Sequence, residues 1–161
     1  IRDSLFFVFH STQEHVQLLQ KQLLDEGLKN CGAIADEKIK SHILKSSVFA
    51  VAKSGTISLE ICNSKIPSII IYKMGTINFF IIKMLVKVKF ANIVNIAAGE
   101  EVIPELLQSK CNAKDIYNTV DKLMNDKTAL ENQLNKTQSI ISNFKTDKSS
   151  EIASSILKDY I

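Results

Sequence analysis

The chain has 161 residues, of which 45% are hydrophobic and 23% charged, close to the averages of globular domains. This length suits one domain with a single core, and the composition excludes a fibrous repeat and a disordered chain. The formal net charge is only +3 and no arginine-rich motif is present, so nucleic acid is not an expected partner. The cysteines Cys31, Cys62 and Cys111 lack metal-ligand spacing, and we expect reduced, cytoplasmic thiols.

The amino-terminal part of the chain has the pattern of a strand followed by a helix. Residues 5–9 form an apolar run that suits a strand covered on both faces, as in a parallel sheet. Ser11 and Glu14 then have the spacing of a capping box, and apolar residues recur at a period near 3.6 until Gly27. This pattern predicts a first β–α unit.

Further strand patterns follow along the chain. They lie at residues 28–33, 48–52, 68–72 and 92–94, the last before a turn at residues 95–99. Asp36 can cap a helix after the first of these strands, and a helix over residues 56–63 follows the second. Pro67 opens the third, a β-branched run suited to a central parallel strand.

The second half of the chain carries mainly helix patterns. They lie at residues 76–87, 101–108, 113–124, 128–144 and 150–160. Strands that alternate with helices predict an α/β fold, with a Rossmann-like parallel sheet of four or five strands and flanking helices. We expect this domain to span residues 1–112, and an all-α C-terminal tail over residues 113–161 to pack on it or to cross to a second copy.

A first candidate site lies where the strand at residues 48–52 turns into the next helix. Ser54, Gly55 and Thr56 form this turn, where a glycine lets a ligand approach and helix N–H groups can bind phosphate oxygens. Glu60 lies one helical turn after Thr56 and can accept hydrogen bonds from a ribose. The alternative is a cap, a turn and a solvated helix residue, and these residues by themselves leave both interpretations open.

A second candidate is Asn95, in a segment of small residues that ends at Gly99. Its amide can bind a sugar or a diphosphate, or it can form a local Asx turn. The histidines His10, His15 and His42 show no metal-ligand spacing. The sequence therefore contains no complete catalytic constellation and predicts no metal site.

Four segments in series resemble lipid-A-disaccharide synthase. They are S-G-T-x-x-L-E from Ser54 to Glu60, Y-x-M from Tyr72 to Met74, L-V-K from Leu85 to Lys87, and N-x-x-x-G-x-x-x-x-P-E-L-L-Q from Asn95 to Gln108. Each motif is weak singly, but the order and spacing of all four are specific. The resemblance covers nearly the whole chain.

The resemblance implies the carboxy-terminal, donor-binding half of an inverting glycosyltransferase of the GT-B type. The family joins UDP-2,3-diacylglucosamine to 2,3-diacylglucosamine 1-phosphate, giving lipid A disaccharide and UDP, without a metal or cofactor. By resemblance, Glu60 holds the ribose and the turns hold the diphosphate. The implied UDP-sugar-binding residues are Ser54, Gly55, Thr56, Glu60, Asn95 and Gln108, and none of them is catalytic.

The chain departs from the family pattern in two ways. Glu100 stands where the family commonly has a basic residue, which puts a phosphate role for this position in doubt. The acceptor-binding domain with its catalytic carboxylate, and the first strand of the donor domain with a G-S-R turn, would lie before Ile1. We therefore expect a fragment that binds the donor weakly and transfers nothing alone, with the missing N-terminal domain as its partner.

A membrane surface is another expected partner. The predicted helix that begins at Thr76 is almost wholly apolar and is too short to span a bilayer. It packs in the core or against the missing domain, or it docks at the membrane through Phe79 and Phe80 while Lys83 and Lys87 meet anionic lipid. Together with lipid substrates, this docking implies a cytoplasmic protein peripheral to the inner membrane.

Two other hypotheses stay open, and a homodimer is compatible with each. One is a noncatalytic module of the same fold that binds a nucleotide sugar or a partner, and the other is a different GT-B transferase. An acceptor domain encoded in the DNA immediately upstream would distinguish a truncated enzyme from an independent module. Titration with UDP, UMP and acylated UDP-glucosamine would rank the three.

Overall fold

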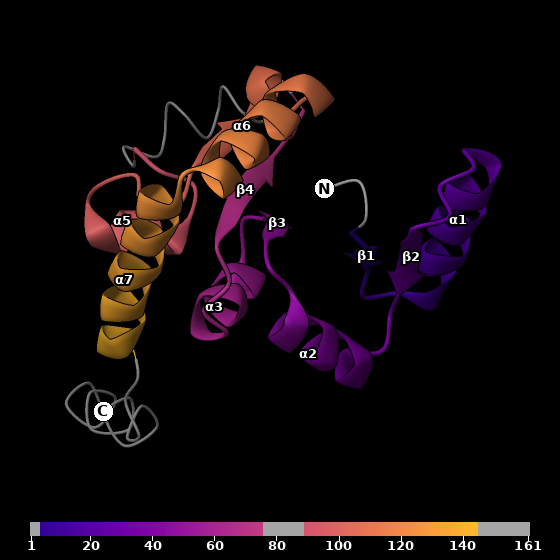
Figure 1. Cartoon of the computed structure of the whole chain (residues 1–161), viewed down its shortest axis with the longest axis horizontal. Coiled ribbons are helices and arrows are strands. Elements are labelled where there is room, and N and C mark those ends of the chain that lie inside the picture. Colours follow the sequence, from indigo (N-terminus) through magenta and orange to yellow (C-terminus); the bar gives the residue numbers. More distant parts are fainter. Residues whose placement is uncertain (1–3, 76–88, 145–161) are drawn as a thin grey trace, which may run out of the picture. The chain divides into compact units, whose positions relative to one another are not determined.

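The computed structural model describes residues 4–75 and 89–144. The chain forms two compact units, one that ends at Ser47 and one that begins at Val48 (Figure 1). The predicted α/β class and parallel pairing are confirmed, and the five strands of the described residues form a two-stranded and a three-stranded sheet. The boundary expected after residue 112 stays a prediction.

The first unit alternates strands and helices. Its elements are β1 (Phe6–Phe9), α1 (Gln13–Asp25), β2 (Cys31–Ile34) and α2 (Glu37–Ser46). β1 and β2 pair in parallel, with Phe6 opposite Cys31 and Phe9 opposite Ile34. The four elements agree with the predicted order, and β2 begins later than the apolar pattern indicated.

The two helices of this unit begin differently. Asp36 caps α2 as predicted, because its side chain accepts hydrogen bonds from two backbone N–H groups of the first turn, at 2.8 and 2.9 Å. The capping box predicted from Ser11 and Glu14 is wrong. The N-cap of α1 is Thr12, and no side chain caps this helix. The Thr12 hydroxyl lies 2.6 Å from Nδ1 of His15 instead, so the local polar groups bond to one another.

The second unit contains a parallel sheet in the order β3–β4–β5. Its strands are β3 (Ala50–Lys53), β4 (Ser68–Tyr72) and β5 (Glu105–Leu107). Its helical elements are α3 (Thr56–Asn63), α5 (Ile93–Ala98), a 3-10 turn (Gln108–Lys110), α6 (Ala113–Asn125) and α7 (Lys127–Phe144). Ile69 and Ile70 of β4 are fully buried, so the β-branched run after Pro67 is the central strand, as predicted.

The strand predicted at residues 92–94 is wrong. This segment starts α5, because Oδ1 of Asn92 accepts a hydrogen bond from the N–H of Val94 at 2.8 Å and caps the helix. The predicted turn at residues 95–99 lies largely within the same helix, which ends at Ala98 and is followed by Gly99 with a φ of 70°. A side-chain cap therefore decided the conformation of a short apolar run.

The helix predicted at residues 101–108 is also wrong. These residues contain β5, which pairs with β4 so that Leu106 lies opposite Ile71. The N–H of Ile70 donates to the carbonyl of Pro104 at 2.9 Å, just before β5 begins. Pairing with a buried neighbouring strand thus outweighed a local pattern that favoured a helix.

The core of the second unit lies between its sheet and the two closing helices. Ile69, Leu106 and Leu123 are buried together. Partly buried apolar residues pack around them, namely Phe49, Ile71, Ile116, Val120, Ala129 and Leu130. α6 and α7 confirm two predicted helices, whereas those predicted at residues 76–87 and 150–160 lie outside the described residues.

A buried glutamine of α7 takes the place of a neighbouring strand at the start of β4. Gln133 is 5% exposed. Its Oε1 accepts a hydrogen bond from the N–H of Ser68 at 2.8 Å, and its Nε2 donates to the carbonyl of Ser68 at 2.9 Å. Pro104 has no N–H to offer at this end of β5. The amide therefore satisfies backbone groups that the sheet leaves unpaired.

Two further features bear on the chemistry of the chain. No helix among residues 4–75 and 89–144 is both long and apolar enough to cross a membrane. The three cysteines are free. Burial raises the pKa of the Cys62 thiol to about 11, so this thiol stays protonated at neutral pH.

Gln133→Ala is expected to lower the free energy of unfolding by about 1–3 kcal/mol, because it leaves a buried N–H and carbonyl of Ser68 without partners. Urea denaturation followed by circular dichroism measures the change. Asn132→Ala, at an exposed position of the same helix, is the matched control and should change stability by less than about 0.5 kcal/mol. Equal losses in both variants would contradict this role of Gln133.

Candidate functional site

The turn between β3 and α3 places three of the predicted residues at the carboxyl edge of the sheet. Ser54 and Gly55 follow the last residue of β3, and Thr56 begins α3. Gly55 has a φ of 153° and a ψ of −165°, a conformation almost restricted to glycine. No atom lies within 4 Å of the position where a Cβ would stand. The glycine therefore makes the turn and leaves open access to the backbone.

No side chain caps the amino end of α3. Gly55 is the N-cap residue, and the first N–H groups of an α-helix have no acceptor within the helix. The Gly55 carbonyl accepts hydrogen bonds from the N–H of Ser58 at 3.1 Å and from the Ser58 hydroxyl at 2.6 Å. The helix dipole adds partial positive charge at this end. The geometry suits an anionic group such as a phosphate.

Two charged side chains belong to the same part of the second unit. Glu60 is half-buried and lies one turn of α3 after Thr56, on the same face of the helix. Lys53, the last residue of β3, holds Nζ 5.3 Å from the centre of the Tyr72 ring at the end of β4. Sequence reasoning did not single out Lys53, although it directly precedes the turn.

A hydrogen-bond network joins this turn to the start of α5. The Ser54 hydroxyl donates to the carbonyl of Ala91 at 2.7 Å. The Glu105 carboxylate accepts hydrogen bonds from the N–H groups of Ala91 and Asn92, at 2.8 and 2.9 Å. Both backbone groups of Ala91 are thus hydrogen-bonded, the carbonyl to Ser54 and the N–H to Glu105. Sequence reasoning missed Glu105, whose only signal was its place in the P-E-L-L-Q motif.

Asn95 is fully buried, and its amide makes four hydrogen bonds inside the protein. Nδ2 donates to the carbonyl of Ile103 at 2.7 Å and to Oε1 of Glu105 at 2.8 Å. Oδ1 accepts from the N–H groups of Val102 and Ile103, both at 2.9 Å. These bonds use the full capacity of the amide and fix the segment before β5. The contact of Asn95 with a UDP-sugar stays a prediction.

Gln108 joins the segments that follow β4 and β5. Its Oε1 accepts a hydrogen bond from the N–H of Met74 at 2.9 Å, and its Nε2 donates to the Met74 carbonyl at 3.2 Å. Two motifs that lie far apart in the sequence, Y-x-M and P-E-L-L-Q, therefore meet through this side chain. The contact of Gln108 with a UDP-sugar also stays a prediction.

The structure brings part of the predicted set together. Residues 54–56 form one turn, which Ala91 and Glu105 connect to Asn95. Gln108 follows β5 at the same carboxyl edge of the sheet, where parallel α/β sheets bind ligands. The predicted membrane-contact residues Phe79, Phe80, Lys83 and Lys87 lie outside the described residues.

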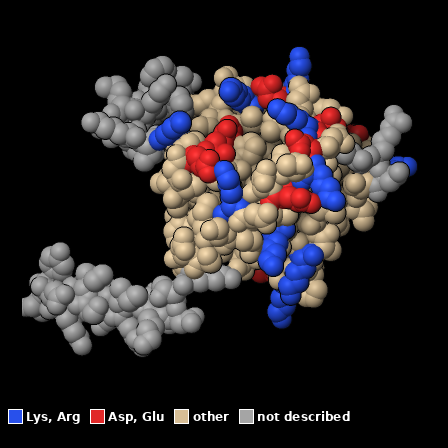
Figure 2. Space-filling view, turned by 60° about the vertical axis from the view of Figure 1, so that its left-hand side comes forward, with Lys and Arg blue, Asp and Glu red and all other residues tan. Residues whose placement is uncertain are grey.

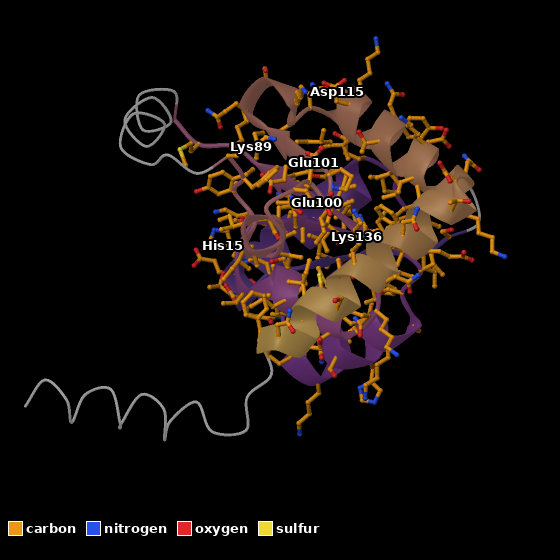
Figure 3. All side chains as sticks on the ribbon, turned by 90° about the vertical axis from the view of Figure 1, so that its left-hand side faces the viewer. His15, Lys89, Glu100, Glu101, Asp115 and Lys136 are labelled. Atoms are coloured by element: carbon orange, nitrogen blue, oxygen red, sulfur yellow. The ribbon has the colours of Figure 1, made fainter. Side chains whose placement is uncertain are left out.

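A cavity of about 370 Å³ lies beside the start of β5. Its lining residues are Lys89, Phe90, Gly99, Glu100, Glu101, Glu105 and Leu107. Glu100 also forms an ion pair with Lys136 of α7 at 2.7 Å (Figure 3). Acidic and basic side chains are mixed on the face of the molecule that Figure 2 shows. Three carboxylates among the lining residues disfavour a phosphate. The uncapped turn at residues 54–56 is therefore the better candidate site.

Glu105→Gln is expected to lower the free energy of unfolding by about 1–3 kcal/mol, because an amide has one acceptor oxygen where the carboxylate has two. At least one N–H of Ala91 or Asn92 then loses its partner. Urea denaturation measures the change. Glu100→Gln, which removes only an exposed ion pair, is the control and should cost less than about 1 kcal/mol. A Glu105→Gln protein as stable as the control would contradict the network.

Comparison with known proteins identifies the family. The chain matches the family described as lipid-A-disaccharide synthetase over residues 2–158. It is 34% identical over 158 residues to lipid-A-disaccharide synthase of Rickettsia typhi, an alignment that covers 96% of this chain and 41% of that relative. Identity is 41% over 128 residues to the Rickettsia felis relative, covering 77% and 32% of the two chains. It is 34% over 139 residues to the relative from Sulfurihydrogenibium sp., covering 81% and 36%.

The chain spans at most 41% of the length of these three relatives. The resemblance that four short motifs indicated is confirmed by a match over nearly the whole chain. On these grounds the chain belongs to the lipid-A-disaccharide synthetase family.

Proposed function

We propose that this chain forms the UDP-sugar-binding part of a lipid-A-disaccharide synthase, which joins UDP-2,3-diacylglucosamine to 2,3-diacylglucosamine 1-phosphate and releases UDP. The observation that carries the proposal is the uncapped start of α3, where Gly55 leaves the backbone open to a ligand. Family membership supports the reaction. The acceptor site and the catalytic carboxylate belong to a part of the relatives that this chain does not span.

Each element of the turn has a role in this proposal. The diphosphate accepts hydrogen bonds from the first N–H groups of α3, and the dipole of that helix favours the negative charge. Thr56, within the turn, and Lys53, directly before it, supply a hydroxyl and an ammonium group as further donors. Glu60, one helical turn later, binds the ribose hydroxyl groups. Asn95 and Gln108 reach the donor only by exchanging hydrogen bonds that they make within the protein.

Gly55→Ala is expected to weaken UDP binding about tenfold, which corresponds to 1.4 kcal/mol, because a Cβ strains this conformation and shifts the N–H groups that meet the diphosphate. Isothermal titration with UDP measures the affinity. Gly27→Ala is the matched control, since Gly27 also has a positive φ, of 68°, and open space around it but follows α1. Only the Gly55 variant should lose affinity.

Two outcomes would contradict the proposal. UDP affinity equal in Gly55→Ala, Gly27→Ala and the unchanged chain would exclude the turn as the diphosphate site. Sugar transfer by the purified chain, supplied with donor and acceptor, would show that the acceptor site lies within these 161 residues.

The membrane enters the proposal as the surface that supplies both lipid substrates. Apolar residues of the segment that includes Phe79 and Phe80 enter the headgroup region, and Lys83 and Lys87 meet anionic lipid. The support for this contact is the sequence pattern. It implies a protein at the cytoplasmic face of the inner membrane.

The double variant Phe79→Ser, Phe80→Ser is expected to reduce cosedimentation with liposomes of anionic phospholipid at least about threefold, because two apolar side chains no longer enter the bilayer interface. Phe144→Ser is the matched control, since Phe144 is 45% exposed at the end of α7. Unchanged sedimentation of the double variant would exclude docking through this segment.

A further inference from the structure

A lysine and a tyrosine meet at the carboxyl end of the sheet in the second unit. Lys53 is the last residue of β3, and Tyr72 is the last residue of β4. Residues opposite each other in a parallel pair share one face of the sheet, and successive residues alternate between the faces. Lys53 lies opposite Ile71, so Tyr72 belongs to the other face. The Lys53 ammonium nevertheless lies 5.3 Å from the centre of the Tyr72 ring, so the lysine side chain crosses the end of the sheet.

This contact orients a side chain that is otherwise flexible. Lysine carries its ammonium on a four-carbon stem, and fixing such a stem costs conformational entropy. The face of an aromatic ring attracts an ammonium within about 6 Å of its centre. Within the described residues of the second unit, no ion pair includes Lys53. The ring therefore orients the ammonium without neutralising its charge.

The position of this ammonium suits the candidate site. Ser54 and Gly55 directly follow Lys53, and the uncapped α3 begins at the next residue. The lysine and the turn thus belong to the same carboxyl edge, where parallel α/β sheets bind ligands. An ammonium has three N–H donors, and the ring engages only the side that faces it. Donors therefore remain for the oxygens of a phosphate.

We propose that Tyr72 is a positioning residue, which holds the Lys53 ammonium over the carboxyl end of the sheet so that the site selects a nucleotide by the charge of its diphosphate. The inference rests on the proposed function, because it assigns both residues to that site. A full positive charge distinguishes a diphosphate from a neutral nucleoside more strongly than backbone N–H groups do. Because the ring already orients the lysine, less entropy is lost when the ligand binds.

The experiment compares the binding of UDP and of uridine to the full chain and its variants. Lys53→Gln should weaken UDP binding about tenfold and uridine binding less than about twofold, because only UDP carries negative charge. Lys53→Arg keeps the charge and can stack on the ring, so its UDP affinity should stay within about threefold of the unchanged chain. Isothermal titration measures the binding of UDP, and NMR titration measures the weaker binding of uridine.

A double-mutant cycle tests the role of Tyr72. Tyr72→Leu should weaken UDP binding about threefold, whereas Tyr72→Phe keeps the ring and should bind UDP like the unchanged chain. In a Lys53→Gln background, Tyr72→Leu should cause no further loss, because the ring acts only through the ammonium. A ring that only stabilised the fold would weaken UDP binding in both backgrounds.

Lys89→Gln is the matched control. The Lys89 ammonium also lies 5.3 Å from the centre of an aromatic ring, that of Phe90. Both residues line the cavity that three carboxylates share. Because these carboxylates offset the lysine charge, its removal should change the UDP affinity less than about twofold.

The inference is overturned if Lys53→Gln binds UDP as tightly as Lys89→Gln does, or if it weakens uridine binding as much as UDP binding. It is also overturned if Tyr72→Leu has the same effect in both backgrounds, because Lys53 then acts without the ring. Loss of UDP affinity in Gly55→Ala but not in Lys53→Gln would leave the proposed function standing without this inference. An unchanged chain that binds no UDP would refute both.

Discussion

The candidate site depends on the hydrogen bonds that the carboxylate of Glu105 accepts. It accepts hydrogen bonds from two consecutive backbone N–H groups before α5 and from the amide of Asn95. Through Ala91, it also positions the segment that receives the Ser54 hydroxyl. Because the carboxylate lies at the start of β5, these hydrogen bonds fix both the turn after β3 and the start of α5 to the same sheet. A single side chain thus couples two loops that lie far apart in the sequence.

Polar side chains also decide where each sheet stops. Gln133 supplies the donor and acceptor that the strand beginning after Pro104 cannot supply to Ser68. In the first unit, Oε1 of Gln20 accepts a hydrogen bond from the N–H of Ala33 at the outer edge of β2. In both units, a glutamine amide from a helix therefore satisfies backbone groups of a strand.

The sequence by itself determined the elements whose signal is local, and it determined the family. The turn at residues 54–56, the helix that follows it and the β-branched strand β4 could be predicted with nearly correct bounds. Glycine at position 55 has a physical reason, because its φ of 153° excludes most other residues. The order of four motifs identified the family, which the match over residues 2–158 confirms.

Only the tertiary structure decided the second half of the site. β5 was expected to be a helix, and it is a strand because β4 presents backbone groups and a buried face that no local pattern contains. The ligand contacts of Asn95 and Gln108 stay predictions, and the structure adds that their amides bond to Ile103 and Met74. Such bonds join residues whose proximity arises only on folding. The sequence could therefore indicate the candidate site residues, but the hydrogen-bond partners of their side chains depend on contacts that form only in the folded structure.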